Sequence, residues 1–69
     1  MKYDFPSRLK KLRLKKSMTM TQLAAETNLS YTSIQSWESG GRVPAATAVI
    51  ILADFFGVTA DYLLGRAEN

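Results

Sequence analysis

The chain has 69 residues and a formal net charge of +3, with nine Lys or Arg against six Asp or Glu. It contains neither His nor Cys, which excludes disulfides and Cys-based metal sites and removes the commonest general base and metal ligand. No apolar run approaches the length of a membrane span, and the N-terminus has no signal-peptide pattern. We therefore expect one soluble, cytoplasmic domain over residues 1–69, with no membrane partner, no metal and no cofactor.

Helix signals dominate the first third of the chain. Pro6 suits the first turn of a helix, and apolar residues follow it at helical spacing, which predicts a helix over residues 6–16. Thr19 can cap a second helix over residues 20–27, and Asn28 fits the left-handed residue at which a helix ends. Two short helices with a tight connection are therefore expected here.

Three further helices are predicted in the rest of the chain. Ser30 caps a helix over residues 31–39, which a pair of glycines ends. Pro44 opens a fourth helix that Gly57 stops, and Thr59 caps a short final one. The core-like apolar positions of the fourth helix are Ala48, Val49, Leu52, Ala53 and Phe56. Strand signals are nearly absent, so we predict an all-α domain of five short helices.

The helix over residues 31–39, YTSIQSWES, has an unusual polar face. At 100° per residue Ile34 and Trp37 fall on one stripe, which favours a core position for the tryptophan. The opposite side carries short uncharged side chains, although Lys and Glu are better helix formers than Ser and Thr. This face is either an ordinary solvated surface or one that touches a partner closely.

The connection around Asn28–Ser30 has the length of a helix-turn-helix turn, in which the second helix lies in the DNA major groove. From about residue 7 to 66 the chain resembles the phage-repressor and Cro-type (lambda-repressor-like, XRE) helix-turn-helix family of bacterial transcriptional regulators. The residues that carry the resemblance are RLKKLR (8–13), MTMTQLAAETNLSYTSIQSWESG (18–40), RVP (42–44) and LADFFGVTADYLLGR (52–66).

The resemblance implies a compact five-helix DNA-binding domain with its helix-turn-helix at about residues 19–39. Double-stranded DNA is then the partner. The positions that face the groove in this family correspond to Tyr31, Thr32, Gln35 and Ser36. For Tyr31, packing against the turn is an alternative. Candidate phosphate contacts are Thr19, Met20, Thr21, Ser33, Ser39 and Arg42.

Two residues depart from the family pattern. Met20 stands where members usually carry a Gln that contacts a phosphate, so this contact is expected to fall to Thr19, Thr21 or the backbone N–H groups of the helix. Ser17 stands where Gly is common at the end of the first helix. We therefore expect this helix end to be less favourable than in a typical member.

The resemblance also predicts an ion pair between Arg13, late in the first helix, and Glu38, late in the third. We expect a partly buried bidentate pair that fixes the third helix against the first. The four lysines of the first helix are expected to form a solvated face behind the motif rather than the main DNA contact; they are Lys10, Lys11, Lys15 and Lys16.

The fourth helix carries an excess of apolar residues. Ile51 and Phe55, four residues apart, stand where the family usually has Lys and Ala. Together with Tyr62 they are a candidate homodimer patch. A few exposed apolar residues are normal in any protein, which leaves a monomeric surface as the alternative.

The leading hypothesis is a sequence-specific transcriptional regulator, a repressor that binds a pseudo-palindromic operator as a homodimer. The competing hypothesis is an antitoxin or another helical adaptor that binds a protein with the same fold. An enzyme is not expected, because the chain lacks the residues of acid–base, thiol and metal chemistry. No feature of the sequence indicates a small-molecule ligand.

Overall fold

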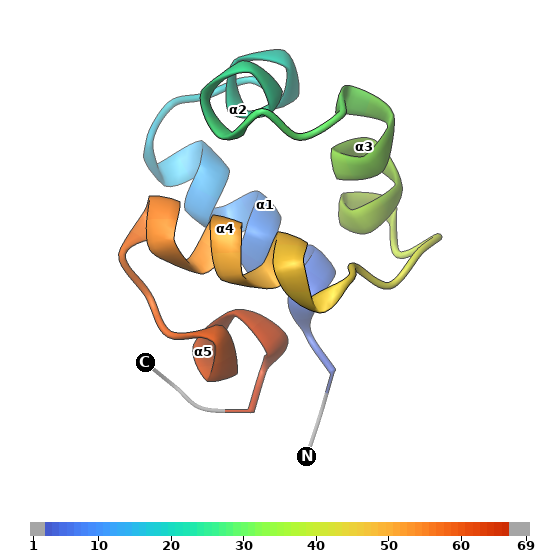
Figure 1. The fold of residues 1–69 in the computed structure, drawn as a ribbon, viewed down its shortest axis with the longest axis vertical. Helices are drawn as coiled ribbons and strands as arrows, with labels where there is room; N and C mark the ends of the chain where they lie inside the picture. Colours follow the sequence, from blue (N-terminus) through green and yellow to red (C-terminus); the bar gives the residue numbers. More distant parts are fainter. Residues whose placement is uncertain (1–2, 67–69) are drawn as a thin grey trace.

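Five α-helices follow one another through short connections in the computed structural model, which describes residues 3–66 (Figure 1). They are α1 (Phe5–Lys15), α2 (Met20–Thr27), α3 (Tyr31–Ser39), α4 (Ala46–Phe56) and α5 (Ala60–Leu64). The described part of the chain contains no strand. The predicted all-α, five-helix class is therefore confirmed.

Short-range capping interactions set the helix ends. The hydroxyl of Thr19 accepts a hydrogen bond from the backbone N–H of Gln22 at 3.0 Å, and the Gln22 amide oxygen accepts one from the N–H of Thr19 at 2.8 Å. This is a complete capping box. Asn28 and Gly40, which end α2 and α3, both have the left-handed conformation. The expected limits of these two helices are confirmed.

The expected start of the fourth helix was wrong. Pro44 does not open α4, because α4 begins at Ala46 and its N-cap is the extended residue Ala45. The Pro44 ring is buried ahead of the helix, so it anchors the preceding loop to the domain. At the other end of the chain, Pro6 lies in the first turn of α1, as expected, although α1 begins one residue earlier.

One core joins residues from all five helices. α1 contacts α3 and α5, and α4 packs against α2 and α5. Trp37 is buried, and its ring meets that of Phe5 edge-on at a centroid distance of 6.2 Å, which confirms its core position. Phe56 is half-buried rather than fully buried. The buried residues of this core cluster are Phe5, Leu9, Leu23, Ile34, Trp37, Ala48, Val49, Leu52, Ala53 and Leu63.

Ser17, at the junction of α1 and α2, has a φ of 56°. A left-handed conformation costs a residue with a Cβ about 1–2 kcal/mol. Glycine avoids that cost, but it is more flexible in the unfolded chain, and ordering it on folding costs about 0.5–1 kcal/mol more. Ser17→Gly is therefore expected to raise the free energy of unfolding by about 0.5–1 kcal/mol, measured by urea denaturation. Ser17→Ala is the matched control and should give no gain. A Ser17→Gly variant less stable than the wild type would contradict this account.

Candidate nucleic-acid interface

A three-residue turn, residues 28–30, joins α2 to α3. Asn28 turns the chain in the left-handed conformation, and its N–H donates to the carbonyl of Ala24. The N–H of Leu29 donates to the same carbonyl at 3.2 Å. Ser30 then caps α3 by accepting from the N–H of Ser33 at 3.0 Å. Every step of this turn is fixed by a local hydrogen bond, so α2 and α3 have a defined relative orientation.

α3 has one buried and one exposed side. Ile34 is fully buried and Trp37 is 5% exposed, and together they hold the helix on the core. The exposed side contains Tyr31, which is 43% exposed, with Thr32 and Gln35. Ser36 is half-buried at its margin. The structure thus brings three of the four residues predicted to face the groove onto one accessible surface without a charged side chain.

The ion pair expected between α1 and α3 is present. Arg13 donates from Nε to one carboxylate oxygen of Glu38 at 2.7 Å and from Nη2 to the other at 2.9 Å. Its Nη1 donates to the backbone oxygen of Met18 at 2.7 Å. Both side chains are less than a tenth exposed. The hydrogen bond with Glu38 is the main reason why the pKa of Arg13 is raised, so the guanidinium stays charged at neutral pH.

The N-terminal turn of α2 presents donors to an anion. The N–H groups of Met20 and Thr21 lie in the first turn, where helix geometry provides no intrahelical acceptor. The Met20 side chain itself is half-buried against the core, so only its backbone is suited to a phosphate contact. Gln22 is exposed, and its amide oxygen is engaged with Thr19, which leaves the amide NH₂ facing away from that bond.

Gln22 was not among the phosphate contacts predicted from the sequence. The signal was present, since a Thr followed three residues later by Gln is a capping-box pattern. Because the capping box engages the amide oxygen of Gln22, its NH₂ group is left to donate to a partner.

The end of α3 leads into a loop that contains the other phosphate candidates. The Ser39 hydroxyl donates to the backbone oxygen of Ser36 at 3.0 Å, and the N–H of Gly41 donates to that same oxygen at 2.9 Å. Ser33 is half-buried and tied to Ser30 through its N–H and its hydroxyl. Arg42 is exposed. Among the six candidates, Arg42 and Thr21 therefore have the most accessible side chains without a described hydrogen bond.

The proposed dimer residues are only partly accessible. Ile51 is 40% exposed, whereas Phe55 is half-buried, meets Phe56 edge-on and lies 5.3 Å from the ammonium of Lys16. Tyr62 is half-buried, and the guanidinium carbon of Arg8 lies 4.5 Å from the centroid of its ring. Ile50, at 55% exposure, is more accessible than Ile51, although it was not among the residues of the predicted patch.

Other kinds of site have little support in the part of the chain that the structure describes. No group of three or more Asp or Glu residues comes close enough there to hold a metal ion. Within residues 3–66, no helix has both the length and the apolar character needed to cross a bilayer.

A capped helix-turn-helix whose second helix has a polar, uncharged exposed side is the arrangement found in helix-turn-helix DNA-binding domains. A model of the helix-turn-helix family HTH_3 matches residues 9–63. The chain belongs to this family of Cro/C1-type (XRE) transcriptional regulators, whose helix-turn-helix domain binds DNA and is not catalytic.

Two HTH-type transcriptional regulators are similar to this chain along most of its length. The HTH-type transcriptional activator BcrR of Enterococcus faecalis is 38% identical over 65 residues, which cover 94% of this chain and 32% of that protein. The HTH-type transcriptional regulator AnsR of Bacillus subtilis is 39% identical over 62 residues, or 90% of this chain and 53% of that protein. The chain therefore spans only a third to about half the length of these relatives.

A solved structure has the same fold. The crystal structure of a transcriptional regulator from Listeria innocua superimposes with a TM-score of 0.87, over 100% of this chain and 64% of that one. The two sequences are 23% identical. At this level of sequence identity the similarity shows a shared fold alone.

Proposed function

We propose that this chain represses transcription by binding a pseudo-palindromic operator as a homodimer, with one α3 helix in each of two successive major grooves. The observation that carries the proposal is the outer side of α3, which is accessible, polar and free of charge. In such a complex the half-sites are one helical turn, roughly 34 Å, apart. A dimer bound to the operator would then prevent RNA polymerase from binding the same stretch of DNA.

Four side chains are proposed to read bases. Gln35 lies near the middle of the exposed face of α3, and its amide matches the donor–acceptor pair of adenine. Thr32 can hydrogen-bond several bases and can touch a thymine methyl group. Tyr31 and Ser36 lie at the two margins of this face. Short side chains here let the helix backbone approach the base edges closely.

Phosphate contacts are proposed on both sides of α3. On one side lie the N-terminal turn of α2, with Thr19, Thr21 and the backbone of Met20, and the amide of Gln22. On the other side lie Ser39 and Arg42, with Ser33 nearer the turn. Backbone N–H groups at a helix start attract an anion through the positive end of the helix dipole. Such contacts would fix the register of α3 without selecting a sequence.

The variant Gln22→Glu is expected to keep the stability of α2 and to weaken the proposed contact between Gln22 and a DNA phosphate. The carboxylate can still accept from the N–H of Thr19, and a negative charge in the first turn stabilises a helix by about 0.3–1 kcal/mol. The same charge repels a phosphate and removes the donor. We expect the variant to melt at or above the wild-type temperature and to bind DNA more weakly, as measured by fluorescence anisotropy at fixed salt.

Gln22→Met is the matched control, because it removes the donor without adding charge. It should weaken DNA binding less than Gln22→Glu, and it should also lower stability because the cap acceptor is lost. Wild-type DNA affinity in both variants would remove Gln22 from the interface.

Dimerisation is proposed to involve the outer side of α4, where Ile51 and Phe55 lie four residues apart and Ile50 is exposed beside them. Phe55→Lys would place a charge on this surface. We expect it to reduce cooperative binding to a two-half-site duplex while leaving binding to a single half-site unchanged, measured by gel shift on the two duplexes. Unchanged assembly on the full site would end this assignment of the interface.

The experiment that tests the proposed function is selection from random duplex DNA at near-physiological salt, followed by sequencing, since affinity depends strongly on salt. Enrichment of an inverted repeat with half-sites one turn apart is the expected result. A reporter gene with that repeat over its promoter then tests the sign of regulation, and lower expression supports repression. No enriched motif, with salt-sensitive nonspecific binding alone, would favour the antitoxin or adaptor hypothesis.

A further inference from the structure

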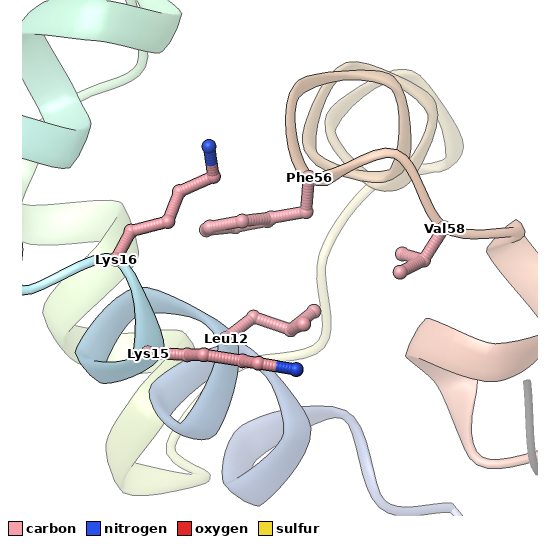
Figure 2. A pocket seen from close by; sticks show the side chains of 5 residues that line it. All are labelled: Leu12, Lys15, Lys16, Phe56 and Val58. Atoms are coloured by element: carbon pink, nitrogen blue, oxygen red, sulfur yellow. The ribbon is translucent and has the colours of Figure 1, made fainter.

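A hollow of about 290 Å³ opens between the end of α1 and the end of α4 (Figure 2). Leu12 of α1 and Phe56 of α4 extend toward each other across it, and Val58, just after α4, lies at one end. The remaining lining is Lys15 and Lys16 of α1. The floor is thus apolar, and the two lysines that form its basic rim extend on opposite sides of it, Lys16 beside Phe56 and Lys15 below Leu12 (Figure 2).

The basic rim lacks acidic partners on the described part of this chain. None of the ion pairs among residues 3–66 involves Lys11, Lys15 or Lys16. Lys11 and Lys15 are four residues apart on one side of α1, and like charges at this spacing disfavour the helix. The negative ends of α1 and α4 near the hollow offset part of this charge. Three exposed ammonium groups still leave the rim positive.

We propose that this hollow and its rim dock an acidic protein segment that carries one large apolar side chain. The apolar side chain fills the space among Leu12, Phe56 and Val58. Carboxylates on either side of it pair with Lys15 and Lys16, and Lys11 extends the same positive surface by one turn. This is a second interaction surface, separate from α3, so a partner bound there leaves the recognition helix free for DNA.

The volume of the hollow and the chemistry of its lining favour an acidic segment with one apolar side chain. Typical small-molecule pockets measure about 300–1,000 Å³ and enclose most of their ligand, whereas this hollow lies at the lower limit and suits one side chain. A DNA phosphate would pair with the lysines, but it has nothing apolar to place against Leu12, Phe56 and Val58. A protein segment with both carboxylates and an apolar anchor matches the floor and the rim together.

The test is titration of the isotope-labelled chain with a synthetic peptide, followed by NMR of the backbone amides. The peptide has blocked ends and one central leucine flanked by glutamates. We expect shifts at Leu12, Lys16 and Val58 and none along the outer side of α3. Replacing the leucine by alanine should weaken binding at least about tenfold. Replacing the glutamates by glutamines should also weaken binding.

Matched protein variants test the basic rim. Lys15→Gln should weaken peptide binding about two- to fivefold, as expected for one exposed ion pair. Lys10→Gln makes the same chemical change on another side of α1 and should have no effect. Both variants should bind operator DNA as the wild type does.

Two outcomes would overturn the proposal. One is the absence of shifts at the hollow with the glutamate–leucine peptide. The other is a set of shifts there on adding duplex DNA, together with weaker DNA binding by Lys15→Gln, which would assign the rim to phosphates. DNA binding through α3 is measured separately, and neither outcome contradicts it.

Discussion

Glu38→Ala is expected to lower the free energy of unfolding by about 3–5 kcal/mol, because it leaves the Arg13 guanidinium buried without its counter-charge. Arg13 is 7% exposed and makes two hydrogen bonds to Glu38 and one to the Met18 carbonyl. A chain of this length has a total stability of roughly 3–10 kcal/mol at 0.05–0.15 kcal/mol per residue. The loss is therefore about a third of that stability or more, and Tm falls by about 4–8 °C for each kcal/mol.

A double replacement keeps this prediction testable if the single variant does not fold. Arg13→Met combined with Glu38→Leu removes both charges and leaves apolar side chains of similar size, so it should be more stable than Glu38→Ala. It still leaves the Met18 carbonyl without its donor, which costs about 1–3 kcal/mol. Thermal unfolding followed by circular dichroism measures all three proteins.

A loss of less than about 1 kcal/mol in Glu38→Ala would mean that the pair behaves like an exposed surface ion pair. Since Glu38 lies on α3, such a result would also remove the proposed reason for the fixed position of the recognition helix against α1.

Gln35→Ala is expected to abolish discrimination at one base pair of each half-site. A bidentate amide–adenine contact discriminates by about 1–3 kcal/mol. A dimer makes the contact twice, so the selected operator should lose about 2–6 kcal/mol, which is roughly thirtyfold or more in affinity. The stability of the domain should not fall, because Gln35 is exposed and alanine is the better helix former. Repeating the selection with the variant shows which position loses its preference.

Arg42→Gln provides the contrast for this experiment. A lost phosphate contact weakens binding almost equally on every sequence and makes the dependence of affinity on salt less steep, whereas a lost base contact changes sequence preference. If Gln35→Ala weakened all sequences equally and kept the original motif, Gln35 would contact the DNA backbone rather than a base.

The sequence alone determined most of the helix pattern. Thr19 and Ser30 begin α2 and α3, and Asn28 and Gly40 end them. These signals act within about four residues, because a cap satisfies the backbone groups of its own first or last turn. The burial of Trp37 and its separation from the polar face followed in the same way from helical periodicity.

The candidate site could be predicted from sequence only in part. Periodicity and the family pattern placed Gln35 and Thr32 on the outer side of α3 and paired Arg13 with Glu38. They gave no orientation for the Gln22 amide, which depends on its bond to Thr19. They also gave no contacts for the Met20 side chain, because its burial depends on which other helices pack beside it.

The tertiary structure alone decided how distant segments meet. Pro44 looked like a helix start, but its ring is buried before α4 begins, and burial is a property of the assembled core. Phe55 and Phe56 share the margin of that core, while Ile50 remains exposed. The hollow between α1 and α4 joins Leu12 to Val58, which lie far apart in the chain. Capping and periodicity are local and can be read from sequence, whereas exposure and cavities depend on packing between helices.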